Sequence, residues 1–165
     1  MLEAPFEGGC QCEAVRYRCT SPPYVSYTCH CRDCQRLTSS AFATCVQVPV
    51  EALHLMRGSV SSRERLADSG NRPVTSFCSR CGSSLFVANP ARPRLRTIYV
   101  GTLDRAQDVE VSAHIWTSRR LPWVVLPTHH RIFSEAGDWR PDPGAGTWRK
   151  KTSLCKLQPH PSHQE

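Results

Sequence analysis

The chain has 165 residues, of which 39% are hydrophobic and 21% charged, and its formal net charge at pH 7 is +7. This is enough sequence for one domain with its own core, and the lack of a glycine period or a dominant residue excludes collagen-like and low-complexity proteins. The longest apolar stretch, around Leu121 to Pro127, is far shorter than the roughly 18–20 residues of a membrane-spanning helix, so we expect no membrane contact.

Short strands separated by Gly, Pro, Asn and Ser account for most of the chain up to Arg140. We expect strands at 14–19, 24–28, 41–48, 53–56, 60–66, 84–88, 97–101 and 113–116, and a short helical turn at 32–38. No segment before Arg140 keeps an apolar 3.6-residue period over a helical length. The pattern predicts a mainly β domain over residues 1–140. Residues 141–165 are rich in Pro, Gly, Lys, Gln and His, which predicts a flexible C-terminal tail.

The ten cysteines are the most informative part of the composition. Residues 1–7 carry acidic side chains where a signal peptide carries Lys or Arg, so we expect a cytoplasmic protein. In that reducing compartment disulfides are rare, and a high cysteine density indicates metal or thiol chemistry. Cys19 and Cys45 lie in strand-like apolar sequence and are expected in the core, whereas Cys155 falls in the tail.

Two of the cysteine groups predict a closed metal site. Cys78 and Cys81 have the Cys-x-x-Cys-Gly spacing of a zinc knuckle, in which a tight turn brings two thiolates to one ion. A tetrahedral site needs two further ligands, either from Cys10 and Cys12 or from the cysteines at 29–34. Cys10 and Cys12 are the simpler partners, and we call the resulting set the four-cysteine site.

Cys29, Cys31 and Cys34 then remain together, and we call them the three-cysteine site. Three protein ligands with a vacant fourth position are typical of catalytic zinc, where water or substrate fills the gap. Alternatively His30 or Asp33 closes this site, and both zinc ions are structural. A redox dithiol is a further alternative for the Cys-x-x-Cys spacings, but that motif usually stands in a βαβ context that this sequence lacks.

The cysteine spacings and their neighbours resemble those of the glutathione-dependent formaldehyde-activating enzymes, whose domain is shared with centromere protein V. The matching segments run over most of residues 6–123: Gly8-Gly-Cys-Gln-Cys12, Cys29-His-Cys-Arg-Asp-Cys-Gln-Arg36, Ser40-Ala-Phe-Ala43, Gly58-Ser59, Phe77-Cys-Ser-Arg-Cys-Gly-Ser-Ser-Leu85, Gly101-Thr-Leu-Asp104, His114-Ile-Trp116 and Pro122-Trp123.

The resemblance implies a zinc-bound β-tent fold of several coiled sheets with few short helices. It implies a structural zinc on Cys10, Cys12, Cys78 and Cys81, and a catalytic zinc on Cys29, Cys31 and Cys34. It also implies carbon–sulfur lyase chemistry: a small thiol such as glutathione and a small aldehyde, formaldehyde, are joined reversibly into S-hydroxymethylglutathione.

Several residues near these motifs allow two interpretations. Arg32, Arg36 and Arg80 adjoin the cysteines and could orient the carboxylates of glutathione, although arginines in a chain with 18 of them usually form a solvated face. His129 and His130 could border the site or form a surface pair. Many members of the family have Gly where this chain has Ser39, which puts the geometry of the loop after the three-cysteine site in question.

A second hypothesis is a zinc-stapled binding module for nucleic acid or an acidic partner, without catalysis. Against it, the 18 arginines are scattered, and no basic block or aromatic–basic stacking pattern is present in the predicted domain. We therefore expect no nucleic-acid partner, and the zinc-dependent lyase is the favoured hypothesis.

Overall fold

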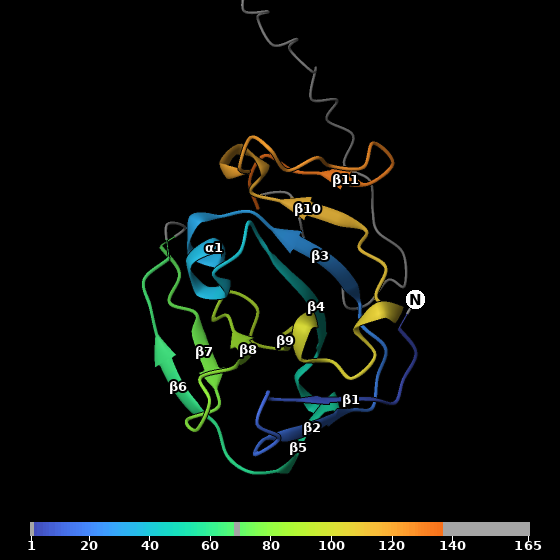
Figure 1. The fold of residues 1–165 in the computed structure, drawn as a ribbon, viewed down its shortest axis with the longest axis vertical. Coiled ribbons are helices and arrows are strands. Elements are labelled where there is room, and N and C mark those ends of the chain that lie inside the picture. The colour runs from blue at the N-terminus through green and yellow to red at the C-terminus, as the bar shows by residue number, and fades with distance from the viewer. Residues whose placement is uncertain (1, 68–69, 137–165) are drawn as a thin grey trace, which may run out of the picture.

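The computed structural model describes residues 2–67 and 70–136, and these form a mainly β fold, as predicted (Figure 1). The described strands are β1 (Phe6–Gly9), β2 (Arg16–Cys19), β3 (Val25–Cys29), β4 (Ala43–Pro49), β5 (Leu53–Arg57), β6 (Ser61–Glu64), β7 (Val74–Phe77), β8 (Ser84–Ala88), β9 (Leu95–Tyr99), β10 (Ala113–Ile115) and β11 (Arg131–Ile132). The helices are α1 (Arg32–Thr38) and four 3-10 turns, η1 (Val50–Ala52), η2 (Val100–Thr102), η3 (Ala106–Asp108) and η4 (Thr117–Arg119).

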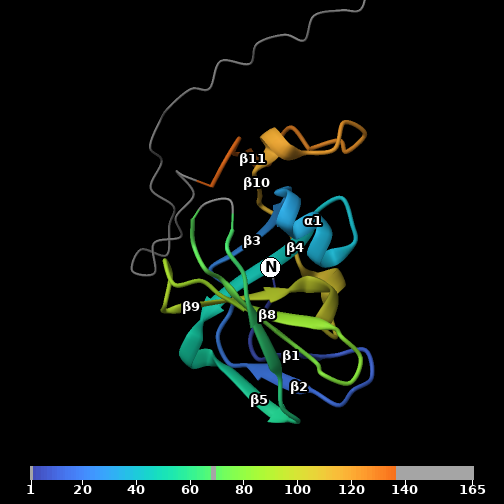
Figure 2. The same cartoon turned by 90° about the vertical axis from the view of Figure 1, so that its left-hand side faces the viewer.

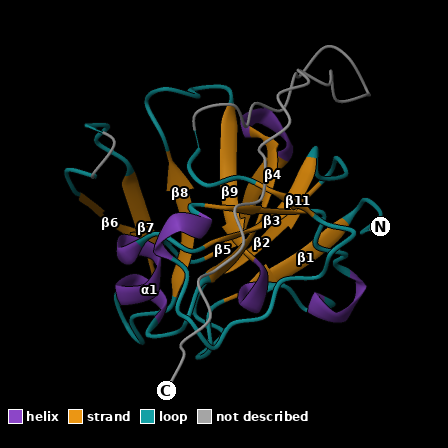
Figure 3. Cartoon of the chain, turned by 90° about the horizontal axis from the view of Figure 1, so that it is seen from above, coloured by secondary structure: helices purple, strands orange, loops and turns teal. Residues whose placement is uncertain are grey.

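The strands form two sheets. The smaller sheet has the order β1-β2-β5 and lies at one end of the molecule, opposite β10 and β11 (Figures 1 and 2). The larger has the order β11-β10-β3-β4-β9-β8-β7-β6, in which β10 pairs in parallel with both β3 and β11. Seen from above, the short helices lie around the periphery of the strands (Figure 3).

Strand alternation on β4 divides the interior into two cores. Val46 and Val48 are fully buried in a core that also contains Tyr17 of the small sheet. Cys45, on the opposite face of β4, belongs to a second core with Tyr27 and Tyr99 of the neighbouring strands. Because successive side chains of a strand point to opposite faces, one strand serves both cores.

Gly8 of β1 lies very close to two other segments of the chain, so no side chain fits at this position. A Cβ on Gly8 would lie 2.3 Å from both the carbonyl oxygen of Thr102 and the hydroxyl oxygen of Tyr17. β1 is held against the η2 segment by a bridge between Gly8 and Leu103. Only a residue without a side chain fits there, which places the Cys10–Cys12 turn against the body of the fold.

Helix α1 connects β3 to β4 and begins and ends with local caps. The Sγ of Cys31 accepts a hydrogen bond from the backbone N–H of Cys34 at the N-terminus. Ser39 ends the helix in the left-handed conformation (φ 51°, ψ 36°), with its N–H donating to the carbonyl of Gln35. Ser39 therefore occupies a backbone region that favours glycine, the residue that many members of the family have at this position.

The expected elements agree with the structure in most of their positions. The helix at 32–38 and the strand at 84–88 have the predicted bounds, whereas β9 lies two residues before the predicted 97–101 because Val100–Thr102 form a 3-10 turn. The sequence analysis missed β1, β7 and β11. Two of these are four-residue strands and β11 has two residues, too short for a periodic signal.

Within the described part of the chain, no helix has both the length and the apolar character needed to cross a bilayer. The predicted tail at 141–165 and the domain boundary at residue 140 lie outside the described residues.

Candidate metal centres and substrate cavity

The four-cysteine site joins the two sheets. The turn after β1 carries Cys10 and Cys12, and the β7–β8 turn carries Cys78 and Cys81, and all four sulfur atoms lie within 4.8 Å of one another. The Sγ of Cys12 lies 3.6 Å from that of Cys10 and 3.8 Å from that of Cys78. The arrangement brings together the four residues that the sequence grouped.

Backbone and hydroxyl donors surround these thiols. The N–H of Val15 donates to the Sγ of Cys10 at 3.2 Å, and the Oγ of Ser83 lies 3.2 Å from the Sγ of Cys81. Contact with Ser83 lowers the pKa of Cys81 to about 5. Cys10 and Cys78 are buried, and donors that favour thiolates suit sulfur ligands of a metal.

The three-cysteine site lies where β3 meets α1. Cys29 is the last residue of β3, Cys31 is the N-cap of α1 and Cys34 lies in its first turn. Their sulfur atoms lie within 4.8 Å of one another, and the Sγ of Cys29 donates to that of Cys31 at 3.4 Å. A strand end and a helix start thus supply all three ligands within six residues.

The thiols of this site share protons unequally. Hydrogen bonds from Cys29 and Cys34 lower the pKa of Cys31 well below its ordinary value, so of the three thiols Cys31 loses its proton most readily. The contacts with Cys31 and Cys34, together with burial, raise the pKa of Cys29 well above its ordinary value. A divalent cation would replace the shared protons and ionise all three sulfurs.

Both clusters fit zinc. Zinc–thiolate bonds of about 2.3 Å in a tetrahedron place neighbouring sulfurs about 3.8 Å apart. Sulfur separations of 3.4 Å in the three-cysteine site and of 3.6 and 3.8 Å in the four-cysteine site lie close to that edge length. The four-cysteine site has a complete tetrahedral ligand set, whereas the three-cysteine site leaves one position without a protein ligand among the described residues.

His30 and Asp33 do not close the three-cysteine site. The His30 ring is fully buried on the other side of β3, where its Nε2 lies 3.0 Å from the hydroxyl of Thr28 and 3.3 Å from Nδ1 of His114. Asp33 forms an ion pair with Arg65, which follows β6. These partners leave the metal cluster to the cysteines.

Gln35 fixes the loop that carries the ligands. Its side-chain amide donates to the carbonyl of His30 at 2.8 Å and to that of Arg119 at 3.0 Å, and its Oε1 accepts from Arg32. The His30 N–H donates to the carbonyl of Ile115 on β10. The peptide between Cys29 and Cys31 is therefore held from both sides.

A cavity of about 1030 Å³ opens directly onto the three-cysteine site. Its floor is formed by β3, β4 and β9, and its lining includes Tyr27, Cys45, Gln47, Thr97 and Tyr99. The four-cysteine site does not line it. A cavity of this size accommodates a small organic ligand.

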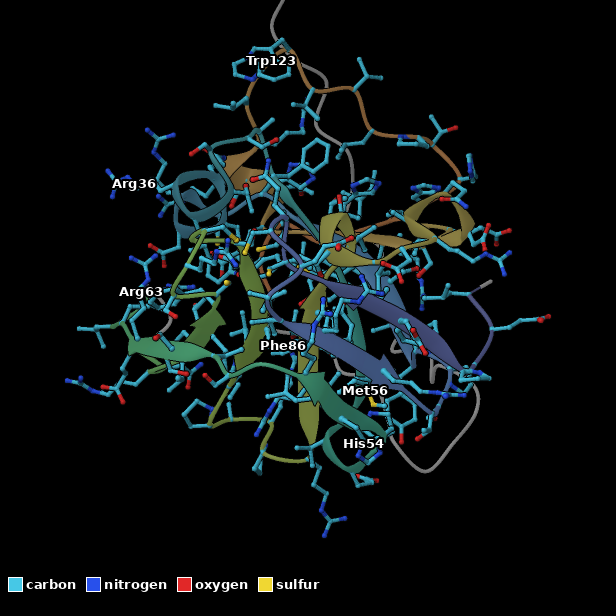
Figure 4. The ribbon with its side chains drawn as sticks, turned by 60° about the horizontal axis from the view of Figure 1, so that its bottom comes forward. Arg36, His54, Met56, Arg63, Phe86 and Trp123 are labelled. Atoms are coloured by element: carbon cyan, nitrogen blue, oxygen red, sulfur yellow. The ribbon has the colours of Figure 1, made fainter. Side chains whose placement is uncertain are left out.

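The arginines of this cavity differ from those singled out in the sequence. Arg65, Arg92, Arg94 and Arg119 line it, together with the carboxylates of Asp33 and Glu135. Arg32 and Arg36 instead border a second hollow on the other side of α1, where Arg36 projects into solvent (Figure 4). Arg80 is exposed in the turn of the four-cysteine site and does not line the large cavity.

The two histidines at 129 and 130 also lie away from this cavity. His130 is half-buried and its Nδ1 lies 2.9 Å from Nε2 of His114, so it belongs to the histidine cluster behind β3. His129 is exposed and packs edge-on against His130.

Sequence reasoning missed Tyr27, Gln47, Arg65 and Gln35. The first two share a face with Cys29 and Cys45 by the period of two along their strands, a signal that was available in the sequence. Arg65 and Gln35 act through contacts 32 and 84 residues away in the chain, with Asp33 and Arg119, which no local pattern reveals.

Comparison with known proteins agrees with this geometry. A curated protein of Halomonas elongata, named as a candidate glutathione-dependent formaldehyde-activating enzyme, is 27% identical over 160 residues, covering 90% of this chain and 97% of that protein. A crystal structure of a Rhodobacter sphaeroides protein has the same fold, with a TM-score of 0.50 and 19% identity over 64% of this chain and 96% of that one.

The model of the glutathione-dependent formaldehyde-activating enzyme family matches residues 5–119. That range contains all seven cysteines of the two clusters and ends at the last arginine of the cavity. The chain belongs to the glutathione-dependent formaldehyde-activating enzyme family.

Proposed function

We propose that the protein is a zinc-dependent carbon–sulfur lyase that joins a thiol, glutathione or a related one, to formaldehyde and cleaves the adduct in reverse. The observation that carries the proposal is the opening of the three-cysteine site, which has no fourth protein ligand within residues 2–67 and 70–136, onto the large cavity. The four-cysteine site would hold a second, structural zinc. Family membership supports the reactants, formaldehyde and glutathione.

Cys29, Cys31 and Cys34 would hold the zinc ion, whose Lewis acidity would lower the pKa of a thiol cosubstrate and so supply a nucleophile at neutral pH. The thiol proton leaves to solvent, the sulfur forms a bond to the carbonyl carbon, and the oxygen receives the carbonyl electron pair and then a proton. The reverse reaction breaks the same carbon–sulfur bond. No electrons are exchanged with the protein.

The cavity residues have defined tasks in this reaction. Burial raises the pKa of Tyr99, so its hydroxyl remains protonated at neutral pH and can donate to an oxygen that gains charge. Hydrogen bonds from Cys29 and Cys34 lower the pKa of Cys31 and favour anionic sulfur at the site. Gln35 keeps the ligand loop in place when the cosubstrate binds and leaves.

Zinc content and turnover test this proposal together. Purified without chelator, the wild type should contain two zinc ions and Cys31→Ser one, with the variant still folded. The variant should also lose formation of S-hydroxymethylglutathione from glutathione and formaldehyde, by about 100-fold or more. Cys19→Ser is the matched control, because Cys19 is buried outside both clusters, and it should keep two zinc ions and activity.

One zinc ion in the wild type, unchanged in Cys31→Ser, would remove the reactive metal and with it the lyase. Two zinc ions without adduct formation would leave the metal centres in place and reject formaldehyde and glutathione as reactants.

We place the protein in the cytoplasm as part of the same proposal. All nine cysteines of the described residues are free thiols, including the two outside the clusters, Cys19 and Cys45, and free thiols are typical of a reducing compartment.

A further inference from the structure

The floor of the large cavity consists of successive rows of side chains on one face of the sheet. Cys29 on β3 is paired with Ala43 on β4, and the next row on this face contains Tyr27, Cys45 and Tyr99. One row further, Gln47 of β4 is paired with Val25 of β3 and Thr97 of β9. Gln47 therefore lies on the cavity floor, two rows from Cys29 of the three-cysteine site.

Gln47 is a buried polar side chain whose carboxamide oxygen is unpaired among the described residues. Its exposed fraction is 4%, and its Nε2 donates to the hydroxyl of Thr97 at 3.3 Å. Its Oε1 has no hydrogen-bond partner among the described residues. An unpaired buried carbonyl oxygen destabilises the fold, and at a cavity wall it is satisfied when a ligand donates to it.

The distance along the strand selects the size of that ligand. Gln47 follows Ala43 by four positions along β4, which corresponds to about 13 Å of extended chain. A two-carbon thiol bound at the three-cysteine site is too short to reach Gln47. The extended backbone of a tripeptide spans about 10 Å, and with the side chain that carries its sulfur it covers the gap.

The charge of the lining selects the ligand's chemistry. Four arginines and two carboxylates border the cavity. One of the arginines, Arg65, is neutralised by its ion pair with Asp33. The remaining excess of positive charge favours an anionic body.

We propose that Gln47 selects the thiol cosubstrate: its carboxamide oxygen accepts a hydrogen bond from an N–H group of an extended, anionic, peptide-like thiol whose sulfur lies at the three-cysteine site. The inference rests on the proposed function for the position of the sulfur. It goes further in naming the residue that distinguishes such a thiol from a short one. Thr97 acts through Gln47 by holding its amide nitrogen.

Binding of two thiols to the zinc-loaded protein tests the proposal without requiring turnover. Calorimetric titration should show glutathione binding the wild type more tightly than 2-mercaptoethanol does. Gln47→Met, which has a similar volume and no acceptor, should weaken glutathione binding by roughly tenfold or more and leave 2-mercaptoethanol binding unchanged. Gln107→Met makes the same exchange at an exposed position of η3 and should change neither affinity.

A stability measurement separates recognition from misfolding. Because Gln47→Met removes an unpaired buried oxygen, its urea midpoint without ligand should equal or exceed that of the wild type. Equal weakening of both thiols, or no change for glutathione, would overturn the role of Gln47. If Gln47→Met weakens the binding of glutathione alone and the wild type forms no adduct with formaldehyde, the proposed lyase is rejected and Gln47 remains a recognition residue.

Discussion

Cys29, His30 and Cys31 are adjacent in sequence but have different chemical environments. The sulfur atoms of Cys29 and Cys31 face the large cavity, whereas the ring of His30 is buried beside Thr28 and His114. The end of β3 sets this difference, because consecutive side chains leave a strand on opposite faces. The cluster that faces the cavity therefore consists of sulfur atoms alone among the described residues, and the imidazole is part of the core.

The buried imidazole makes the fold sensitive to acid. Burial, and then the charges of His114 and Arg120, lower the pKa of His30 from 6.5 to about 4. Between these values the unfolded chain binds the proton and the folded one does not, so stability falls as pH decreases below 6.5. When the pH is lowered from 7 to 5, the free energy of unfolding should therefore fall by about 1–2 kcal/mol less in His30→Gln than in the wild type.

Urea denaturation of both proteins at the two pH values gives this comparison. Acid also protonates the cysteine ligands, but it does so in both proteins and cancels in the difference. Equal losses in the two proteins would show that His30 does not titrate on unfolding.

At the scale of elements, α1 is the most informative segment. Its seven residues include Asp33, Cys34 and Gln35, whose amide holds the loop that carries the cysteines, and its N-cap is Cys31. Its bounds were predictable from sequence, but its C-terminal geometry was not. Ser39 adopts the left-handed conformation there, which costs a residue with a Cβ about 1–2 kcal/mol.

Ser39→Gly should therefore raise the free energy of unfolding by about 0.5–1 kcal/mol, since glycine adopts this conformation without strain but loses more chain entropy. The neighbouring Ser40→Gly is the control. Ser40 does not have a positive φ, so glycine there should lower stability by a similar amount. Chemical denaturation of both variants distinguishes backbone strain from loss of the serine side chain, and equal effects would contradict the strain.

For the whole molecule, the two metal centres differ in what they connect. The four-cysteine site links the turn after β1 to the β7–β8 turn, with Cys12 and Cys78 separated by 66 residues, whereas the three-cysteine site spans six residues. A cross-link over a long loop removes more entropy from the unfolded chain than one over a short loop. The first site should therefore carry global stability and the second should not.

Cys78→Ser should accordingly lower the free energy of unfolding by roughly 2 kcal/mol more than Cys31→Ser. Denaturation of the zinc-loaded variants measures the difference, and a chelator should destabilise the wild type to at least the extent seen in Cys78→Ser. A larger loss in Cys31→Ser would mean that the three-cysteine site carries the global stability.

Local sequence patterns were sufficient to predict the mainly β class, the helix at 32–38 and the division of seven cysteines into two groups. These follow from short-range information: period-two alternation, turn residues and ligand spacing act within a few residues. Grouping Cys10 and Cys12 with Cys78 and Cys81 also needed only ligand counting, and the structure brings these four together.

Which polar side chains line the cavity beside the three-cysteine site depends on how distant segments pack together. Arg65 and Arg119 reach the cavity from the segments after β6 and β10, and Gln47 reaches it through strand register. Arg32 and Arg36, adjacent to the ligands in sequence, are on the other side of α1. Neighbouring residues of a helix or strand point in different directions, whereas the residues that line a cavity come from distant segments. Spacing in the sequence therefore predicted the two cysteine clusters but not the polar lining of the cavity.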